Sequence, residues 1–203
     1  MVAVLTGDII NSEKHPSAVW LPVLKEFLCN SGAQPRDWDI YRGDEFQLRI
    51  PVKDALKTAI HLKAVLKTVK GIDVRLAIGI GEERHSAARI TEANGTAYQR
   101  SGRTFESLKE QKVTLAIATG DPATEKVLNL MIKLGLSFMD EWSTVSAKAV
   151  DWALKHPDLS QQETAVHFKI KQSAVSQQQK RARLDLVLEL LEYYVQTIKN
   201  IPS

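Results

Sequence analysis

The sequence predicts an α+β domain followed by an all-helical module. Short strand-like runs alternate with helix-periodic stretches up to about residue 120, and beyond Gly120 only helical periodicity remains. The chain has 203 residues, enough for one domain and a small second module. Its 44% hydrophobic and 25% charged residues are typical of globular proteins, which excludes extensive disorder.

The first predicted elements are a strand and a helix. "VAVLTGDI" (2–9) is a short apolar run that breaks at Gly7 and Asp8, which is typical of a buried strand. Apolar residues from Ser17 to Leu28 recur at helical spacing, and "CNSGAQP" ends that helix. The single cysteine, Cys29, adjoins this apolar run, so we expect a small buried hydrophobic residue there.

A hairpin is predicted next. "DWDIYRGDEFQLRIP" contains two short strands around residues 42–45, because apolar and polar residues alternate after the turn. A helix (53–70), a strand ("IDVRLAIGIG"), a loop leading into a helix ("NGTAYQRSGRTFESLKEQ") and a strand ("KVTLAIAT") follow. This order predicts an antiparallel or mixed sheet with helices on one face, a ferredoxin-like sandwich over residues 1–120.

The C-terminal third is predicted to be helical, with helix-periodic stretches at 122–133 and 138–155, a connecting helix at 121–141 and a module at 142–203. In "SQQETAVHFKIKQSAVSQQQKRARL", Ala165 and Val175 stand ten residues apart, with Phe168 and Ile170 between them to bury a turn. A helix-turn-helix needs that spacing, although Lys169 replaces the common turn glycine. Residues 142–183 resemble the helix-turn-helix of bacterial regulators and the sigma-factor region-four module.

The side chains of this segment fit DNA. Cations supply affinity for phosphates, and amide and hydroxyl groups at the start of a recognition helix can bond to base edges. The alternative is a solvated helix face. The predicted DNA-binding residues are Lys169, Lys171, Gln172, Ser173, Ser176, Gln177, Lys180, Arg181 and Arg183.

The last predicted helix carries a narrow apolar seam. Its members step by three and four residues: Leu184, Val187, Leu191, Tyr194 and Ile198. One interpretation is a homodimer that sets two recognition helices about 34 Å apart on DNA. The other is packing against the chain's own helices.

Acidic residues end the first strand and mark the hairpin. If the sheet places these elements side by side, Asp8 meets Asp44 and Glu45 at one end, and their oxygens suit Mg²⁺ with a bound phosphate. The alternatives are local: Asp8 could cap the turn that follows it, and Gly43-Asp44 could simply form the hairpin turn.

These motifs carry a resemblance. "TGDIINS", "YRGDEFQ" and "RLAIGIG" are similar to the catalytic cores of class III nucleotide cyclases and GGDEF proteins. The resemblance implies Mg²⁺ held by Asp8 and Asp44, with a backbone carbonyl from Ile9 and Glu45 as a second-metal ligand. The residues it implies for nucleotide binding are Arg42, Gly43, Arg100 and Arg103.

Two departures favour binding over catalysis. The places of the cyclase asparagine and arginine hold Tyr98 and Gly102, and Arg42 replaces a GGDEF glycine.

Along nearly its full length the chain resembles the SatD family, through "AVLTGDIINS", "YRGDEFQ", "RLAIGIGE" and "ANGTAYQRSG". The start of the sequence has no basic leader, so a cytoplasmic protein without a membrane segment is expected.

Together these observations predict a DNA-binding transcriptional regulator whose cyclase-like domain senses a nucleotide or Mg²⁺ without catalysis. Two alternatives stay open. One is a Mg²⁺-dependent nucleotidyl cyclase or phosphotransfer enzyme, and the other is a protein-interaction module without a ligand.

Overall fold

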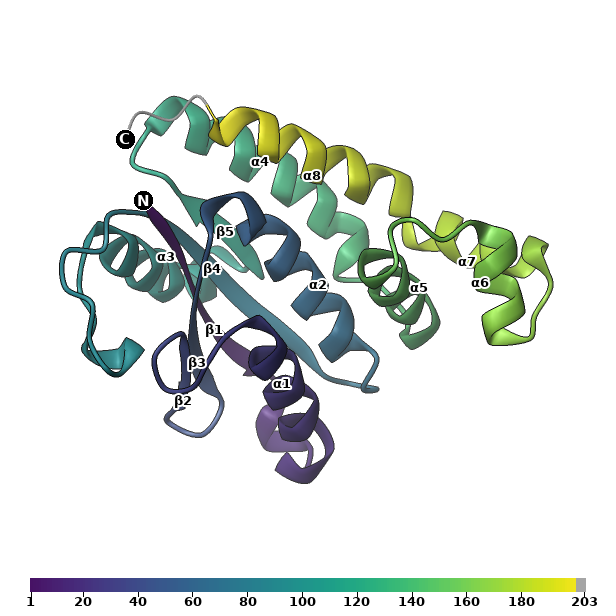
Figure 1. Ribbon diagram of the computed structural model, residues 1–203, viewed down its shortest axis with the longest axis horizontal. Helices are drawn as coiled ribbons and strands as arrows, with labels where there is room; N and C mark the ends of the chain where they lie inside the picture. The colour runs from purple at the N-terminus through teal and green to yellow at the C-terminus, as the bar shows by residue number, and fades with distance from the viewer. Residues whose placement is uncertain (200–203) are drawn as a thin grey trace.

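The computed structural model describes residues 1–199, which form a mixed five-stranded sheet with helices around it (Figure 1). The strands are β1 (Val2–Ile10), β2 (Trp38–Tyr41), β3 (Glu45–Ile50), β4 (Asp73–Gly81) and β5 (Leu115–Ala118). Their order is β2-β3-β1-β4-β5, with β4 and β5 parallel and the other neighbours antiparallel. Each predicted strand is present within a few residues, and the mixed sheet agrees with an α+β fold.

The helices are α1 (Ser17–Ser31), α2 (Ala55–Lys67), α3 (Thr96–Gln111), α4 (Pro122–Met139), α5 (Thr144–Lys155), α6 (Gln161–Phe168), α7 (Gln172–Ala182) and α8 (Leu184–Ile198). Short 3₁₀ turns occur at η1 (Ser12–Lys14), η2 (Val52–Asp54) and η3 (Ile90–Glu92). None of the helices within residues 1–199 has the length and apolar character needed to cross a membrane.

Two local predictions are wrong. The helix-periodic stretch predicted at 138–155 is interrupted at residues 140–143, because Ser143 caps α5 by accepting a hydrogen bond from the Ser146 N–H. The connecting helix predicted at 121–141 corresponds to α4. Cys29 is exposed, because α1 turns Leu24, Phe27 and Leu28 toward the core and leaves the cysteine on its outer side.

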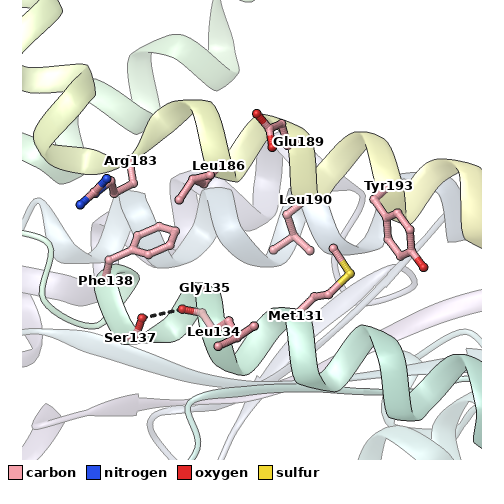
Figure 2. A pocket seen from close by; sticks show the side chains of 10 residues that line it. All are labelled: Met131, Leu134, Gly135, Ser137, Phe138, Arg183, Leu186, Glu189, Leu190 and Tyr193. Atoms are coloured by element: carbon pink, nitrogen blue, oxygen red, sulfur yellow. Dashed lines mark hydrogen bonds between the residues drawn. The ribbon is translucent and has the colours of Figure 1, made fainter.

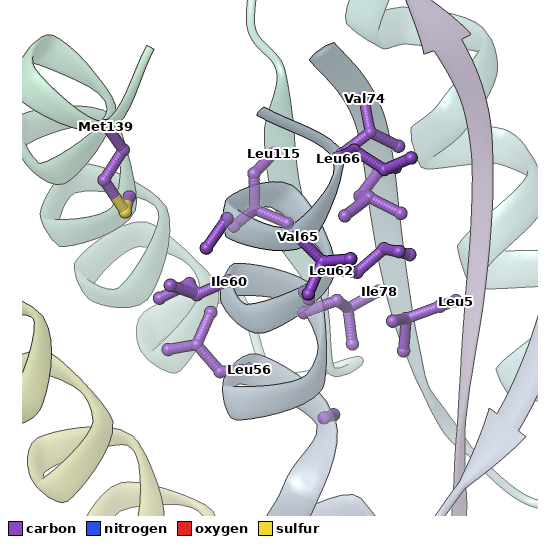
Figure 3. Close-up of a cluster of buried hydrophobic side chains, with 14 of the residues drawn as sticks. Leu5, Leu56, Ile60, Leu62, Val65, Leu66, Val74, Ile78, Leu115 and Met139 are labelled. Atoms are coloured by element: carbon purple, nitrogen blue, oxygen red, sulfur yellow. The ribbon is translucent and has the colours of Figure 1, made fainter. Parts of the chain in front are cut away.

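Helices cover both faces of the sheet, which corrects the predicted one-sided sandwich. α1 and α2 pack on one face, and α3 crosses β4 and β1 on the other (Figure 1). The buried core around α2, on the first of these faces, is drawn in Figure 3. On the α3 side, the Ser101 hydroxyl lies 2.5 Å from the Thr6 hydroxyl and donates a hydrogen bond to the Ala77 carbonyl. Small residues in β4 make this second layer possible.

Gly79 and Gly81 in β4 are required by the closeness of α3. A Cβ atom at Gly79 would lie 2.2 Å from the Ala97 carbonyl oxygen, and one at Gly81 would lie 2.3 Å from the Thr96 hydroxyl. These glycines therefore form the surface of β4 against which α3 packs.

The C-terminal helices share the core of the sheet domain. One cluster of buried apolar residues extends from Ala3 to Ile198, so the predicted domain segments pack together. The seam of α8 faces inward: Val187 is fully buried, and the Tyr194 hydroxyl donates to the Val52 carbonyl at 2.6 Å. Packing on the chain's own helices accounts for this seam. Residues 200–203 of the predicted module lie outside the described range.

The closeness of α3 and β4 can be tested with two glycine variants. Gly79→Ala should lower the free energy of unfolding by about 1–3 kcal/mol or more, because its methyl group meets backbone atoms of α3. Gly102→Ala is the control: it lies in α3 with open space around its Cβ position, and it should raise stability by about 0.5–1 kcal/mol. Urea unfolding measures both, and equal effects would contradict this packing.

Candidate functional site

The acidic residues predicted as a site lie at one end of the sheet. Asp8 stands opposite Glu45 in the β1–β3 ladder and opposite Arg75 in the β1–β4 ladder. Directly paired residues project from the same face of a sheet, so these three side chains are neighbours. The Ser12 hydroxyl, in the turn after β1, donates a hydrogen bond to Asp44 and fixes the hairpin tip at the same end.

Asp8 is the most constrained member of this cluster. Arg75 donates a hydrogen bond to its Oδ2 at 2.8 Å, whereas its Oδ1 is buried and has no hydrogen-bond partner among residues 1–199. Burial raises the pKa of Asp8; Arg75 opposes this increase, and Asp44 and Glu45 add to it. The net pKa is above its ordinary value, so the negative charge is only partly compensated.

The cluster is not a complete metal site by itself. In the described part of the chain, no group of three or more His, Cys, Asp or Glu side chains is placed to hold a metal ion. Ile9 stands opposite Val74 in the ladder with its side chain in the core. The atom that suits a cation is the buried Oδ1 of Asp8, and the charge of Asp44 is near enough to raise the pKa of Asp8; a phosphate or water would have to supply the remaining oxygens.

The predicted nucleotide-binding residues separate into two places. Arg42 and Gly43 form the hairpin tip beside the acids, with left-handed φ angles of 51° and 85°. Arg100 instead donates to the Ile80 and Thr119 carbonyls at 2.5 and 2.8 Å. Ile80 lies five residues beyond Arg75 on β4, about 16 Å along the strand. Arg100 therefore holds the other end of the sheet, while Arg103 is exposed on α3.

Sequence reasoning missed three residues around Asp8. They are Arg75, which donates a hydrogen bond to the Asp8 carboxylate, Lys109 of α3, whose charge opposes the increase in the pKa of Asp8, and Ser12, which anchors Asp44. Alternation in "DVRLAIGIG" could have revealed Arg75, because it stands between two core residues and must face the other side of the sheet. Nothing in the linear sequence identifies Lys109, whose position depends on α3 lying over β1.

The second candidate site is in the helical module. Helices α6 and α7 are joined by residues 169–171, and Ala165 and Val175 are buried between them. Lys169 adopts a left-handed conformation with φ of 53°, the conformation that glycine usually supplies at such a turn. Phe168 and Ile170 are partly exposed and do not bury the turn as predicted; Phe168 instead contacts the edge of Trp152, with ring centroids 4.8 Å apart.

Aromatic and capping contacts hold these short helices in place. Trp152 of α5 stacks on His167 of α6 with ring centroids 4.0 Å apart. Ser160 and Glu163 form a capping box at the start of α6. Trp142 donates from its indole nitrogen to the Ala182 carbonyl at the end of α7, at 2.9 Å. Helices α6 and α7 are therefore fixed against α5 and the α4–α5 turn.

The predicted DNA-binding residues lie on the surface of this module. All are exposed except Ser176, which is half-buried. No ion pair within residues 1–199 engages Lys169, Lys171, Lys180, Arg181 or Arg183. The Gln172 amide already donates to the Gln161 side chain at 2.6 Å. Arg183 differs in position, because it lines a groove between α4 and α8 (Figure 2).

The raised pKa of Asp8 predicts how the stability of the fold depends on pH. A carboxyl whose folded pKa is raised destabilises the fold above that pKa, and the penalty is absent below its unfolded value near 3.8. Asp8→Asn should therefore be more stable than the wild type at pH 7, with the difference vanishing below about pH 4. Asp37→Asn is the opposite control, because the pKa of Asp37 is lowered to about 2 and its charge stabilises the fold. Urea unfolding from about pH 3 to 8 measures both, and a loss of stability in Asp8→Asn at pH 7 would contradict this explanation.

No family model, curated protein or solved structure matches this chain. The resemblance to the SatD family therefore stays a prediction.

Proposed function

We propose that this protein binds DNA through α7 and the turn that precedes it. The observation that supports this proposal most directly is the exposed basic surface of residues 169–183, in which no cation pairs with a carboxylate in the described range. Unpaired lysine and arginine side chains can neutralise phosphates without first breaking an ion pair.

The size and side chains of α7 suit the major groove. The helix has 11 residues and is about 16 Å long, and the major groove is about 12 Å wide. Ser173 and Gln177 are four residues apart, so they share one helix face and can reach base edges together. Lys171 at the start of α7 and Arg181 near its end would then contact phosphates on either side.

Cation variants test DNA binding. Lys171→Ala and Arg181→Ala should each weaken binding to all duplex sequences and reduce the slope of log K against log salt by about 1. Lys25→Ala, an exposed lysine of α1, is the control and should change neither quantity. Fluorescence anisotropy with labelled duplexes measures both, and unchanged affinity of both variants at every salt concentration would refute the proposal.

A second function, binding of a Mg²⁺-nucleotide at the Asp8 end of the sheet, is favoured by the buried Oδ1 of Asp8. A divalent cation there would satisfy an oxygen that has no partner in the described chain and offset the desolvation of the carboxylate. Sensing would require that the ligand bind two conformations with different affinity.

Binding without turnover fits the residues near α3. Tyr98, at the place of the cyclase asparagine, donates to Glu83 at 2.6 Å, and Glu83 also pairs with Arg49. Burial and the contact with Glu83 raise the pKa of Tyr98, and the phenol is held in a different ion-pair network. A cyclase or phosphotransfer reaction would be supported instead by Mg²⁺- or Mn²⁺-dependent turnover of ATP or GTP that Asp8→Ala abolishes.

Ligand-dependent stabilisation tests the nucleotide site. Mg²⁺ with ATP or GTP at about 100 times its Kd should raise the free energy of unfolding of the wild type by about 2.7 kcal/mol. Asp8→Asn should lose this increase relative to its own ligand-free form, whereas Glu13→Gln, an exposed acid of η1, should keep it. Thermal unfolding measures the shift, and equal shifts in the two variants would place any nucleotide elsewhere.

A further inference from the structure

An apolar groove of about 650 Å³ runs between α4 and α8. The two helices lie antiparallel, and the groove is lined by Met131, Leu134 and Phe138 from α4 and by Leu186, Leu190 and Tyr193 from α8 (Figure 2). A Cβ atom at Gly135 would lie 3.6 Å from the Leu190 side chain, an ordinary van der Waals distance, so α8 packs directly against this part of α4. This surface is different from the buried seam of α8.

The groove continues into an exposed apolar stripe. Leu134 is 64% exposed and Leu186 is 42% exposed. Val127 and Leu130, also exposed, precede Leu134 on α4 at a spacing of three and four residues and extend the same face. Contiguous apolar surface of this kind marks an interaction site, because leaving it in water costs free energy.

The charges beside the groove are self-complementary. Arg183 and Glu189 stand three residues before and three residues after Leu186, and neither forms an ion pair within residues 1–199. In a two-fold symmetric interface, residue i of one copy meets residue j of the other, and j meets i. A two-fold axis beside Leu186, perpendicular to the line from Arg183 to Glu189, would set each arginine against Glu189 of the partner subunit.

We propose that a second copy of this chain docks on the α4–α8 groove as a two-fold symmetric dimer. Leu186 then meets its own counterpart near the axis, and the two Arg183–Glu189 pairs close the interface on either side. A stable interface buries about 800 Å² per partner, so the stripe of Val127, Leu130 and Leu134 is part of the contact.

The dimer would bring the two α7 helices together. α7 ends at Ala182, four residues before Leu186, so the C-terminal end of each α7 lies close to the axis. The consequence for DNA rests on the proposed function: two recognition helices related by a two-fold axis read half-sites about 34 Å apart. Dimerisation itself requires no DNA and can be tested alone.

Two leucine variants on α8 test the docking face. Leu186 lines the groove, whereas Leu188 is 48% exposed and lies on another side of the same helix. Sedimentation of the full chain should show a dimer whose Kd rises at least tenfold in Leu186→Glu and stays the same in Leu188→Glu. A wild-type chain that is monomeric up to about 100 μM would overturn the proposal and indicate that the groove binds a different protein. A dimer that Leu186→Glu leaves intact would also overturn it.

Charge exchange tests the pairing even if Leu186→Glu misfolds. Arg183→Glu and Glu189→Arg should each dimerise at least tenfold more weakly, because each homodimer then sets like charges together. An equimolar mixture of the two variants should form the heterodimer. In that heterodimer the two substituted side chains face each other with opposite charge, and the native arginine and glutamate still pair on the other side of the axis.

A mixture that dimerises as weakly as either variant alone would overturn the symmetry. DNA affinity is measured separately on Lys171→Ala, which should still dimerise. Failure of DNA binding and failure of the dimer are therefore distinguishable.

Discussion

A buried lysine fixes the position of the helical module on the sheet. Lys63 of α2 is 1% exposed and pairs with Asp73 of β4 at 2.8 Å and with Asp140 after α4 at 2.7 Å. Lys67 also pairs with Asp73 and donates to the Asp140 carbonyl. A buried ammonium group is tolerated only with such partners, so the turn that follows α4 has one favourable place. Trp142, two residues after Asp140, donates a hydrogen bond to the Ala182 carbonyl and so fixes the end of α7 relative to the same turn.

The same helix makes a second contact with the module. His61 of α2 pairs with Asp151 of α5 at 2.8 Å, and this contact helps to lower the pKa of Asp151. On the sheet side, Asp73 is two residues from Arg75, which holds Asp8. A ligand that drew Asp8 away from Arg75 would therefore act next to the ion pairs that position the module. Such coupling requires that this junction have two arrangements of nearly equal free energy.

The sequence predicted the strands and the meeting of the acids because both depend on local pattern and antiparallel pairing. Alternation fixes which side chains share a face, so Asp8 and Glu45 had to be neighbours once β1 paired with β3. The second helical layer could not be predicted in this way. Gly79 is compatible with a turn, a ligand or a close helix, and only the position of α3 distinguishes them. The α8 seam likewise could face its own chain or another, and the inward-facing Tyr194 decides between them.

At both ends of α7 a cationic residue adopts a strained backbone conformation. Lys169 before the helix and Arg183 after it both adopt a left-handed conformation with φ of 53°. This conformation costs an L-residue about 1–2 kcal/mol, and glycine adopts it without that cost. A glycine at either place would relax the backbone and remove a cation. Strain of this kind is often retained where a side chain has a function, which agrees with the proposed contacts of Lys169 with DNA phosphates and of Arg183 with the partner subunit.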